Sequence, residues 1–307
     1  MRAIQINKYG GPEQLEEVVI PKPQARANQV VVKILAASLN PVDVKITGGA
    51  MREFIPLQFP WIPGRDFAGI VESGGADAVN FQPGDKVFGY SDIGGAYAEY
   101  IAIDVDKIAL KPGAVTYAES ASLATVAQTA IQALDEAGLL SGQTILILGA
   151  GGAVGNVAVQ LAHRQGARII ASASADSLDR LRGYGAQEVL DYKITPFQTV
   201  ARGVDVVLDC IGGETQQQAF STLKPGGVLI SIVQPPNLDE AVKHRVRATM
   251  VQTRSDSNSL HNLALLIDSG EIKPFVGKTY PLTQAANVWR QVKTEHIEGK
   301  IVFTVNM

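Results

Sequence analysis

A run of small residues after an apolar segment carries the clearest chemistry in this chain. Residues 145–148 are apolar, and residues 150–155 read Ala-Gly-Gly-Ala-Val-Gly before a helix-like apolar pattern resumes at Val157. A strand, a tight turn and a helix start leave free N–H groups and the positive end of a helix dipole where the backbone can approach a pyrophosphate. An alanine replaces the first glycine of G-x-G-x-x-G, so the motif alone is weak evidence for a nucleotide site. The strand before it and the helix after it are the stronger evidence. We predict a nucleotide cofactor bound by Ala150, Gly151, Gly152, Ala153, Val154 and Gly155.

The next expected strand indicates which dinucleotide binds. NAD-selective sites carry an acidic residue about 20 residues past the glycine turn, where it binds the ribose 2′-hydroxyl. Here Ser172 and Ser174 take that place, and their hydroxyls can donate hydrogen bonds to a 2′-phosphate. Asp176 competes with this interpretation, since it could bind a ribose if the strand ran further, and Arg180 could add positive charge. The pattern favours NADPH over NADH.

Composition excludes several other classes. The chain has 307 residues, 46% of them hydrophobic and 19% charged, with a net charge of −3, so two ordinary domains fit and no basic excess indicates nucleic acid. No apolar run approaches the about 18 residues of a membrane span, and the N-terminus lacks the apolar centre of a signal peptide. One cysteine, Cys210, fits a reducing compartment. We therefore expect a cytoplasmic protein without nucleic-acid or membrane partners.

The character of the expected elements changes twice along the chain. Short valine-rich strands with glycine and proline turns continue to about residue 115, and an alanine-rich helix follows to about residue 137. Strands and helices then alternate, which indicates a parallel, doubly wound sheet. The expected strands there are 144–148, 168–172, 188–190, 204–209 and 227–233, and the expected helices are 154–164, 177–184 and 215–223. Helices over 260–269 and 284–292 and strands over 276–280 and 300–305 follow.

Five short motifs occur in a recognisable order. They are NPVDVK at residues 40–45, PGRDFAG at 63–69, GAYAEY at 95–100, AGGAVG at 150–155 and GKIV at 299–302. Together they resemble the medium-chain dehydrogenase/reductase superfamily, in particular its zinc-independent branch of quinone oxidoreductases and enone (alkenal) reductases. The resemblance covers nearly the whole chain.

The resemblance implies an α/β fold with two domains. A GroES-like, β-rich catalytic domain would comprise residues 1–115 and 254–307, and a Rossmann domain with the doubly wound parallel sheet would comprise residues 116–253. The C-terminal strand would then return to the first domain. Members of the family hold cofactor and substrate in the cleft between the domains and are commonly dimeric, so we expect a homodimer.

The metal ligands of the zinc-dependent members are missing. Those enzymes need a cysteine, a histidine and a third acidic or cysteine ligand, whereas Asn40 and Asp66 stand near the expected positions and Cys210 is remote. The four histidines are scattered: His163, His244, His261 and His296. We expect no metal, and the implied activity is hydride transfer from NADPH to a quinone or to the activated C=C bond of an α,β-unsaturated carbonyl. A donor near the carbonyl oxygen would stabilise the developing enolate.

The resemblance also assigns roles to single residues. Lys45 matches a lysine near the nicotinamide ribose and the substrate, so it is the first candidate for holding the cofactor, donating to the enolate, or both; Asn40 is the second. Tyr192 matches a tyrosine near the 2′-phosphate, Thr129 lies in a segment similar to one beside the nicotinamide, and Lys300 belongs to the last motif as a possible cofactor contact. Each residue has a plain structural role as its alternative.

Several questions stay open at this level. Cys210 ends an apolar strand and is either a buried small side chain or part of the backbone that lines the ribose. Tyr90 and residues 46–58 are expected to shape a substrate pocket with a mobile wall. Enone and quinone are not distinguished, although Lys45 favours enones. The alternatives are a non-catalytic NADPH-binding redox sensor or crystallin-like protein, and an enoyl-thioester reductase.

Overall fold

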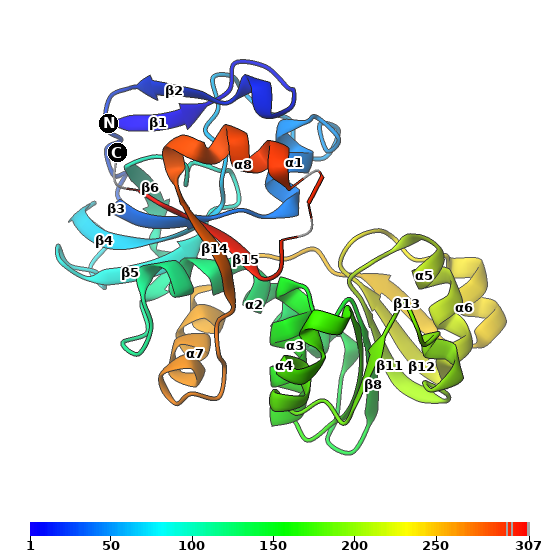
Figure 1. The fold of residues 1–307 in the computed structure, drawn as a ribbon. Coiled ribbons are helices and arrows are strands. Elements are labelled where there is room, and N and C mark those ends of the chain that lie inside the picture. The colour runs from blue at the N-terminus through cyan, green and yellow to red at the C-terminus, as the bar shows by residue number, and fades with distance from the viewer. Residues whose placement is uncertain (293, 296, 306–307) are drawn as a thin grey trace. The chain divides into compact units, whose positions relative to one another are not determined.

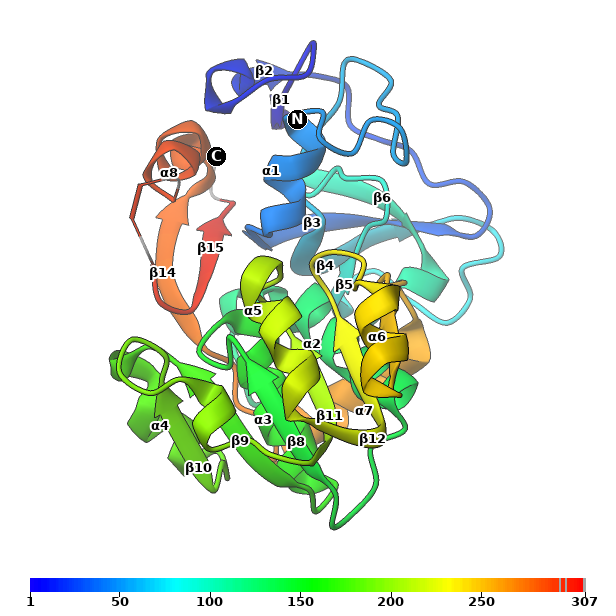
Figure 2. The same cartoon turned by 90° about the vertical axis from the view of Figure 1, so that its right-hand side faces the viewer.

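The chain forms two compact units in a computed structural model that describes residues 1–292, 294–295 and 297–305. Unit 1 comprises Met1–Thr125, Ser255–Gly270 and Pro274–Met307, and unit 2 comprises Val126–Arg254 and Glu271–Lys273. Figures 1 and 2 trace both units from the blue N-terminal strands to the red C-terminal one. The expected domain boundaries, at residues 115/116 and 253/254, stay a prediction.

Unit 2 is built on a parallel sheet of six strands in the order β10-β9-β8-β11-β12-β13. The strands are β8 (Thr144–Leu148), β9 (Arg168–Ala173), β10 (Glu188–Asp191), β11 (Val204–Asp209), β12 (Leu223–Ser231) and β13 (Arg247–Met250). This is the strand order of the Rossmann fold, in which ligands bind beyond the carboxyl ends of the strands where the order reverses. Here the reversal lies between β8 and β11, and the predicted doubly wound sheet is confirmed.

Helices cover both faces of this sheet. Figure 1 shows α3 (Ala153–Arg164) and α4 (Leu178–Gly183) on one face, and α5 (Gly213–Ala219) and α6 (Leu238–His244) on the other. The apolar positions that predicted α3, from Val157 to Ala162, are buried against the sheet. The long helix α2 (Tyr117–Ala137) begins as its sequence indicates, because Thr116 N donates to Glu119 Oε2 at 2.8 Å and Glu119 N donates to Thr116 Oγ1 at 3.2 Å. Within the described residues, no helix is both long and apolar enough to cross a membrane.

Unit 1 contains a seven-stranded sheet and a two-stranded one. The larger sheet has the order β14-β15-β3-β4-β5-β7, with β6 also paired to β3. Its strands are β3 (Gln29–Ser38), β4 (Asp66–Gly74), β5 (Lys86–Tyr90), β6 (Tyr100–Asp104), β7 (Ile108–Leu110), β14 (Val276–Pro281) and β15 (Lys300–Thr304), while β1 (Arg2–Gln5) pairs with β2 (Glu16–Val19). The last strand returns as predicted: β15 lies antiparallel to β3, with Val302 opposite Ser38, and parallel to β14 (Figure 2).

Large aromatic side chains fill the core of unit 1. Tyr97 contacts Phe303 and Trp289 edge to face, with ring centroids 5.2 Å and 6.1 Å apart, and all three side chains are fully buried. Trp289 lies on α8 (Ala285–Gln291), so the C-terminal segment supplies part of the core that the N-terminal strands begin. Another helix of this unit, α7 (Ser257–Asp268), begins where the side chain of Asp256 accepts bonds from two backbone amides.

A short helix in unit 1, α1 (Pro41–Thr47), was missing from the prediction although it carries two predicted site residues. Asn40 precedes its first turn and Lys45 lies in its last turn, where Lys45 is exposed. The Asp43 carboxylate accepts a hydrogen bond from Asn40 N at 2.8 Å, which satisfies one backbone donor at the helix start. Asp43 itself is fully buried, so the helix presents Asp43 to the core and Lys45 to solvent.

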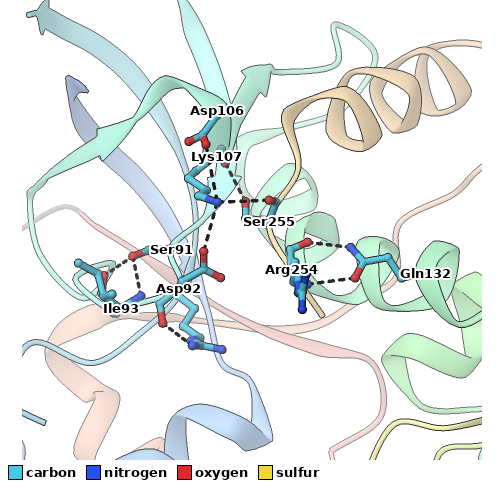
Figure 3. A network of polar contacts seen from close by, with 10 residues as sticks. Ser91, Asp92, Ile93, Asp106, Lys107, Gln132, Arg254 and Ser255 are labelled. Carbon is cyan, nitrogen blue, oxygen red and sulfur yellow. Dashed lines mark hydrogen bonds and ion pairs between the residues drawn. The ribbon is translucent and has the colours of Figure 1, made fainter. Parts of the chain in front are cut away.

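The chain passes from unit 2 to unit 1 between Arg254 and Ser255, and each of these residues is hydrogen-bonded within its own unit. In unit 2, Gln132 Nε2 donates to Arg254 O at 2.7 Å and Arg254 N donates to Gln132 Oε1 at 3.0 Å. In unit 1, Lys107 Nζ donates to Ser255 O and Ser255 Oγ to Lys107 O, both at 3.4 Å (Figure 3). The link between residues 254 and 255 is therefore held from each unit separately.

The close packing of the glycine loop predicts a stability difference between two glycines of unit 2. A Cβ on Gly155 would lie 2.5 Å from the backbone oxygen of Gly149, whereas one on Gly183 would meet nothing within 4 Å. We expect Gly155→Ala to lower the free energy of unfolding by about 1–3 kcal/mol, and Gly183→Ala to raise it by up to about 1 kcal/mol. Thermal unfolding without cofactor measures both, and equal melting temperatures would contradict the packing argument.

The buried carboxyl of Asp43 predicts a pH dependence of stability. Burial raises its pKa to about 7 from a usual 3.8, although the Asn40 amide and the charges of Arg65 and Lys300 oppose the change. Between these values the folded protein holds a proton that the unfolded chain has lost, so this residue's contribution to stability falls as the pH rises from about 4 to 7. Asp43→Asn should remove that fall, and the exposed Asp77→Asn should not.

Urea unfolding at about pH 5 and about pH 8 provides the measurement for Asp43, since most of the expected fall in stability lies between these two conditions. Relative to the unsubstituted chain, the Asp43→Asn variant should have a higher free energy of unfolding at the higher pH than at the lower one. A difference that does not depend on pH would show that Asp43 is ionised in the folded state throughout.

Candidate active site

The loop between β8 and α3 contains the predicted phosphate-binding residues 150–155. Ala150 N donates to Ser172 O at 2.9 Å, which fixes the start of the loop against β9. Gly152 is the N-cap of α3 and offers no side chain to its amides, so the first N–H groups of this 12-residue helix lack a partner within the helix. Gly155 lies so close to Gly149 O that a side chain there would push helix and strand apart. The loop thus presents backbone donors at the carboxyl end of β8, as a pyrophosphate requires.

The end of β9 carries the two serines that predicted NADPH. Ser172 is buried near the end of the strand, and Ser174 follows as the N-cap of a short 3₁₀ helix. Asp176 lies in that 3₁₀ helix and is exposed, because β9 ends at Ala173. No acidic side chain therefore occupies the end of the strand, where an NAD-selective carboxylate would lie.

Two further candidates lie on neighbouring elements, Arg180 in α4 and Tyr192 directly after β10. Arg180 Nη2 donates to Ser177 Oγ at 3.1 Å and to Gly151 O at 3.5 Å, so its guanidinium reaches the glycine loop, which the sequence left uncertain. Tyr192 follows β10, its N donates to Ala173 O at 3.1 Å, and its side chain is 59% exposed. Lys193, which the sequence analysis did not single out, has its ammonium 6.0 Å from the Tyr192 ring.

A buried carboxylate shapes the loop after β11. Asp209 Oδ1 accepts bonds from Ile211 N at 3.0 Å and Gly212 N at 2.8 Å. Its Oδ2 accepts from Gln216 Nε2 at 2.8 Å and Ser231 Oγ at 2.9 Å. These bonds hold the backbone around Cys210 next to the glycine loop, since Cys210 N donates to Leu148 O at 3.2 Å. Asp209 was not among the predicted site residues, although an acid at a strand end shortly before glycines is a signal for such a turn.

Cys210 and Thr129 have side chains engaged within unit 2. Cys210 is half-buried, and burial raises the pKa of its thiol, which keeps it neutral and unreactive as a nucleophile. The Thr129 hydroxyl, on α2, lies 2.7 Å from the Thr253 hydroxyl. The pair joins the middle of α2 to the segment after β13.

In unit 1, the carboxylate of Asp66 organises a buried polar cluster. Its Oδ2 accepts bonds from Ser38 Oγ and Asn40 Nδ2, both at 2.8 Å, and lies 3.4 Å from Lys300 Nζ. Its Oδ1 accepts from Thr125 N at 2.9 Å and from the Thr125 hydroxyl. The cluster therefore joins β3, α1, α2 and β15 around one buried charge.

Asn40 and Lys300 are both engaged inside this cluster. Lys300 is 4% exposed, and its ammonium donates to Asn40 Oδ1 as well as pairing with Asp66. Both polar atoms of the Asn40 side chain thus have partners within unit 1. Lys45, five residues after Asn40, is exposed and lies outside the cluster.

Arg65 and Tyr90 form a second polar group next to this cluster. The Arg65 guanidinium lies over the Tyr90 ring, 5.4 Å from its centroid, and donates to Asp92 O. Burial and a hydrogen bond to Asp92 raise the pKa of the Tyr90 hydroxyl, so this group stays protonated. The local sequence pattern around Arg65 gives no sign that this residue is buried.

Residues 46–58, which were expected to form a mobile pocket wall, contact Tyr9 near the N-terminus. Leu57 N donates to the Tyr9 hydroxyl at 2.8 Å, and the Tyr9 ring packs edge-on against Phe59 with centroids 5.0 Å apart. Gly49 also lies against the Tyr9 ring.

Side chains that could bind a metal are dispersed. Across the described residues, no three His, Cys, Asp or Glu side chains lie close enough together to hold a metal ion. His296 lies outside the described residues, whereas His163, His244 and His261 lie within them. Near Asp66, the neighbouring side chains of Asn40, Arg65 and Lys300 supply donors and positive charge, which is unsuitable chemistry for zinc.

Comparison with known proteins agrees with this architecture. The family of alcohol dehydrogenase GroES-like domains matches residues 26–113, and the family described as zinc-binding dehydrogenase matches residues 184–303. A chloroplast envelope quinone oxidoreductase homolog of Arabidopsis thaliana is 35% identical over 98% of this chain and 98% of its own length. The chloroplastic NADPH-dependent alkenal/one oxidoreductase of the same plant is 31% identical over 98% of this chain and 79% of its own length.

Solved structures confirm the fold. The quinone oxidoreductase from Coxiella burnetii superposes with a TM-score of 0.93 and 32% identity, covering 100% of this chain and 99% of that one. The α/β architecture expected from the motifs, with a GroES-like and a Rossmann-like part, is therefore correct. The chain belongs to the medium-chain dehydrogenase/reductase family, in the branch that contains the quinone oxidoreductases and the alkenal/one oxidoreductases.

Proposed function

We propose that this protein is an NADPH-dependent oxidoreductase that transfers a hydride, without zinc, to a quinone or to the activated C=C bond of an α,β-unsaturated carbonyl. The observation that carries the proposal is the glycine loop at the carboxyl end of β8, followed by serines and not by an acid at the end of β9. The names of its relatives support the same activity: one is a quinone oxidoreductase homolog and another an NADPH-dependent alkenal/one oxidoreductase.

The residues of unit 2 fit the cofactor. Backbone N–H groups of residues 150–155 would hold the pyrophosphate at the start of α3, where a Cβ on Gly155 would close the space. Ser172, Ser174 and Tyr192 would hold the ribose and its 2′-phosphate, and the loop fixed by Asp209 would bring the Cys210 backbone to the ribose. When bound, NADPH supplies a hydride from nicotinamide C4.

The residues of unit 1 would handle the substrate and the nicotinamide end. Lys45 is exposed and positively charged, so it can contact the cofactor ribose or the substrate oxygen. Asn40, whose amide is bonded to Asp66 and Lys300, would act by positioning the start of α1. Thr129 and Lys300 would also contact the cofactor.

We propose further that the protein is a homodimer and works in the cytoplasm. Family resemblance supports the dimer, and a single cysteine that burial keeps as a thiol supports a reducing compartment. The relatives named above carry chloroplast names, so the compartment of this chain has to be determined directly.

The first test follows the oxidation of NADPH and NADH by purified protein with a 1,4-quinone, a short-chain enone, an alkenal and a simple ketone. We expect turnover of the quinone, the enone or the alkenal, a preference for NADPH and no turnover of the ketone. Lys45→Met should lower kcat/KM by about 10²-fold, since it removes a donor and a charge from the reacting groups.

The exposed Lys33→Met is the matched control for Lys45, because it removes one lysine charge from β3 of the same unit. Tight NADPH binding without turnover of any acceptor would favour the sensor or crystallin-like alternative, and turnover of acyl thioesters alone would favour the enoyl reductase. Equal activity of both lysine variants would remove Lys45 from the proposal.

The absence of an acid after β9 predicts a switch in cofactor preference. Ser174→Asp places a carboxylate where the 2′-phosphate would lie, so we expect the Kd of NADPH to rise by about 10-fold or more while that of NADH does not rise. Binding can be measured by the fluorescence of the reduced nicotinamide. Ser221→Asp, an exposed serine of the same unit, controls for the added charge, and equal effects on both cofactors would place the 2′-phosphate elsewhere.

A further inference from the structure

Arg65 is a buried cation whose direction is fixed by the chain on both sides. Gly64 before it has a φ of +82°, and a Cβ there would lie 2.1 Å from the Tyr97 ring, so only glycine fits. β4 begins directly after it at Asp66. The residue is only 9% exposed, and its Nε is buried without a hydrogen-bond partner.

The acids around Arg65 are engaged by other groups. Asp66 pairs with Lys300, and the Asp92 carboxylate lies 3.4 Å from Lys107 Nζ (Figure 3) and accepts the Tyr90 hydroxyl. Arg65 meets Asp92 only through the backbone oxygen. Within the part of the chain that the structure describes, Arg65 therefore has no ion pair with a carboxylate.

A buried charge without a counter-charge is costly, and proteins keep one mainly where a ligand or a reaction supplies the opposite charge. The Tyr90 ring face offers a weak partner, but the Tyr90 hydroxyl is neutral and cannot balance the guanidinium. Asn40, the second predicted candidate after Lys45, already bonds Asp66 and Lys300. The buried Asp43 carboxyl also feels the charge of Arg65, but burial raises its pKa to about 7, so it balances the guanidinium only in part. Among the described residues, Arg65 is thus a buried cation of unit 1 without an ion pair to a carboxylate.

We propose that Arg65 binds the substrate oxygen on which negative charge develops during hydride transfer. This inference rests on the proposed function. The hydride forms a C–H bond at the β-carbon, the C=C π pair shifts to give an enolate with its charge on the carbonyl oxygen, and a proton from water completes the α-carbon. NADPH is oxidised to NADP⁺ and the C=C bond is reduced. A quinone would place the same charge on a hydroquinone oxygen, so the substrate class is acceptors that become oxyanions.

A purely structural role is the alternative, in which Arg65 only clamps the segment after β5 through Asp92 O. Two substitutions separate the roles. Arg65→Gln removes the charge but keeps an amide donor for the Asp92 oxygen, and Arg65→Lys keeps the charge. Arg26→Gln removes an exposed arginine of the same unit as the matched control. Thermal unfolding of each variant identifies those that fold.

The probe is 4-nitrophenol, whose ionised and neutral forms absorb at different wavelengths and whose phenolate resembles an enolate. Bound to the protein with NADP⁺ present, it should ionise at lower pH than in water. Arg65→Gln should abolish that shift, Arg65→Lys should keep most of it, and Arg26→Gln should leave it intact. With an enone, Arg65→Gln should lower kcat/KM by about 10²-fold, with the Kd of NADPH unchanged.

Unchanged nitrophenol titration in a folded Arg65→Gln variant would overturn the proposal, as would a loss of the shift in Arg65→Lys equal to that in Arg65→Gln. Because the probe reports on charge without turnover, it tests Arg65 even if no acceptor is reduced. If acceptors are reduced but bound 4-nitrophenol still ionises at the lower pH in the Arg65→Gln variant, the role of Arg65 is wrong and the proposed reaction stands. An Arg65-dependent shift without turnover would leave an oxyanion site and refute the proposed reaction.

Discussion

The buried carboxylate of Asp66 is the constraint on which the architecture of unit 1 depends. A carboxylate removed from water is stable only when both oxygens are bonded and a cation is near. Here the bonds come from Ser38, Asn40 and Thr125 and the cation is Lys300. These residues belong to β3, the start of α1, α2 and β15, so one charge fixes the relative placement of four segments that are distant in sequence. Because Arg65 directly precedes Asp66, the same hydrogen bonds also fix the backbone position of Arg65.

Unit 2 solves the same problem of positioning with different groups. Its donors to a ligand are backbone amides, and their placement depends on glycines that allow close approach and on the buried Asp209. Asp209 resembles Asp66 in having its oxygens bonded inside the protein, but its partners are two loop amides and two neutral side chains. Fixed amides suit a phosphate, whereas the cationic groups of unit 1 suit an oxygen that gains charge during reaction.

Local patterns were sufficient for much of unit 2. The predicted bounds of β8 and β11 agree with the structure, because each is a short segment rich in apolar and β-branched residues between turn residues. α1 escaped prediction because seven residues that begin with proline and include β-branched side chains give no helical period. β13 escaped because it has only four residues, Arg247–Met250, of which Thr249 alone is β-branched. Burial of Arg65 and the partners of Lys300 arise from contacts between distant segments, which no local pattern contains.

The position of Lys300 near the end of the chain has a consequence for biosynthesis. All segments of unit 2 precede Pro274, so this unit can be complete while translation continues. Asp66 and Asn40, in contrast, emerge early and wait more than two hundred residues for their cation, since the ion pair joins residues 66 and 300. During that interval β3 lacks its neighbour β15, and the Asp66 carboxylate lacks its cation. A nascent chain stopped before β15 would present all segments of the nucleotide-binding unit, joined to a unit 1 that still lacks the cation of Asp66.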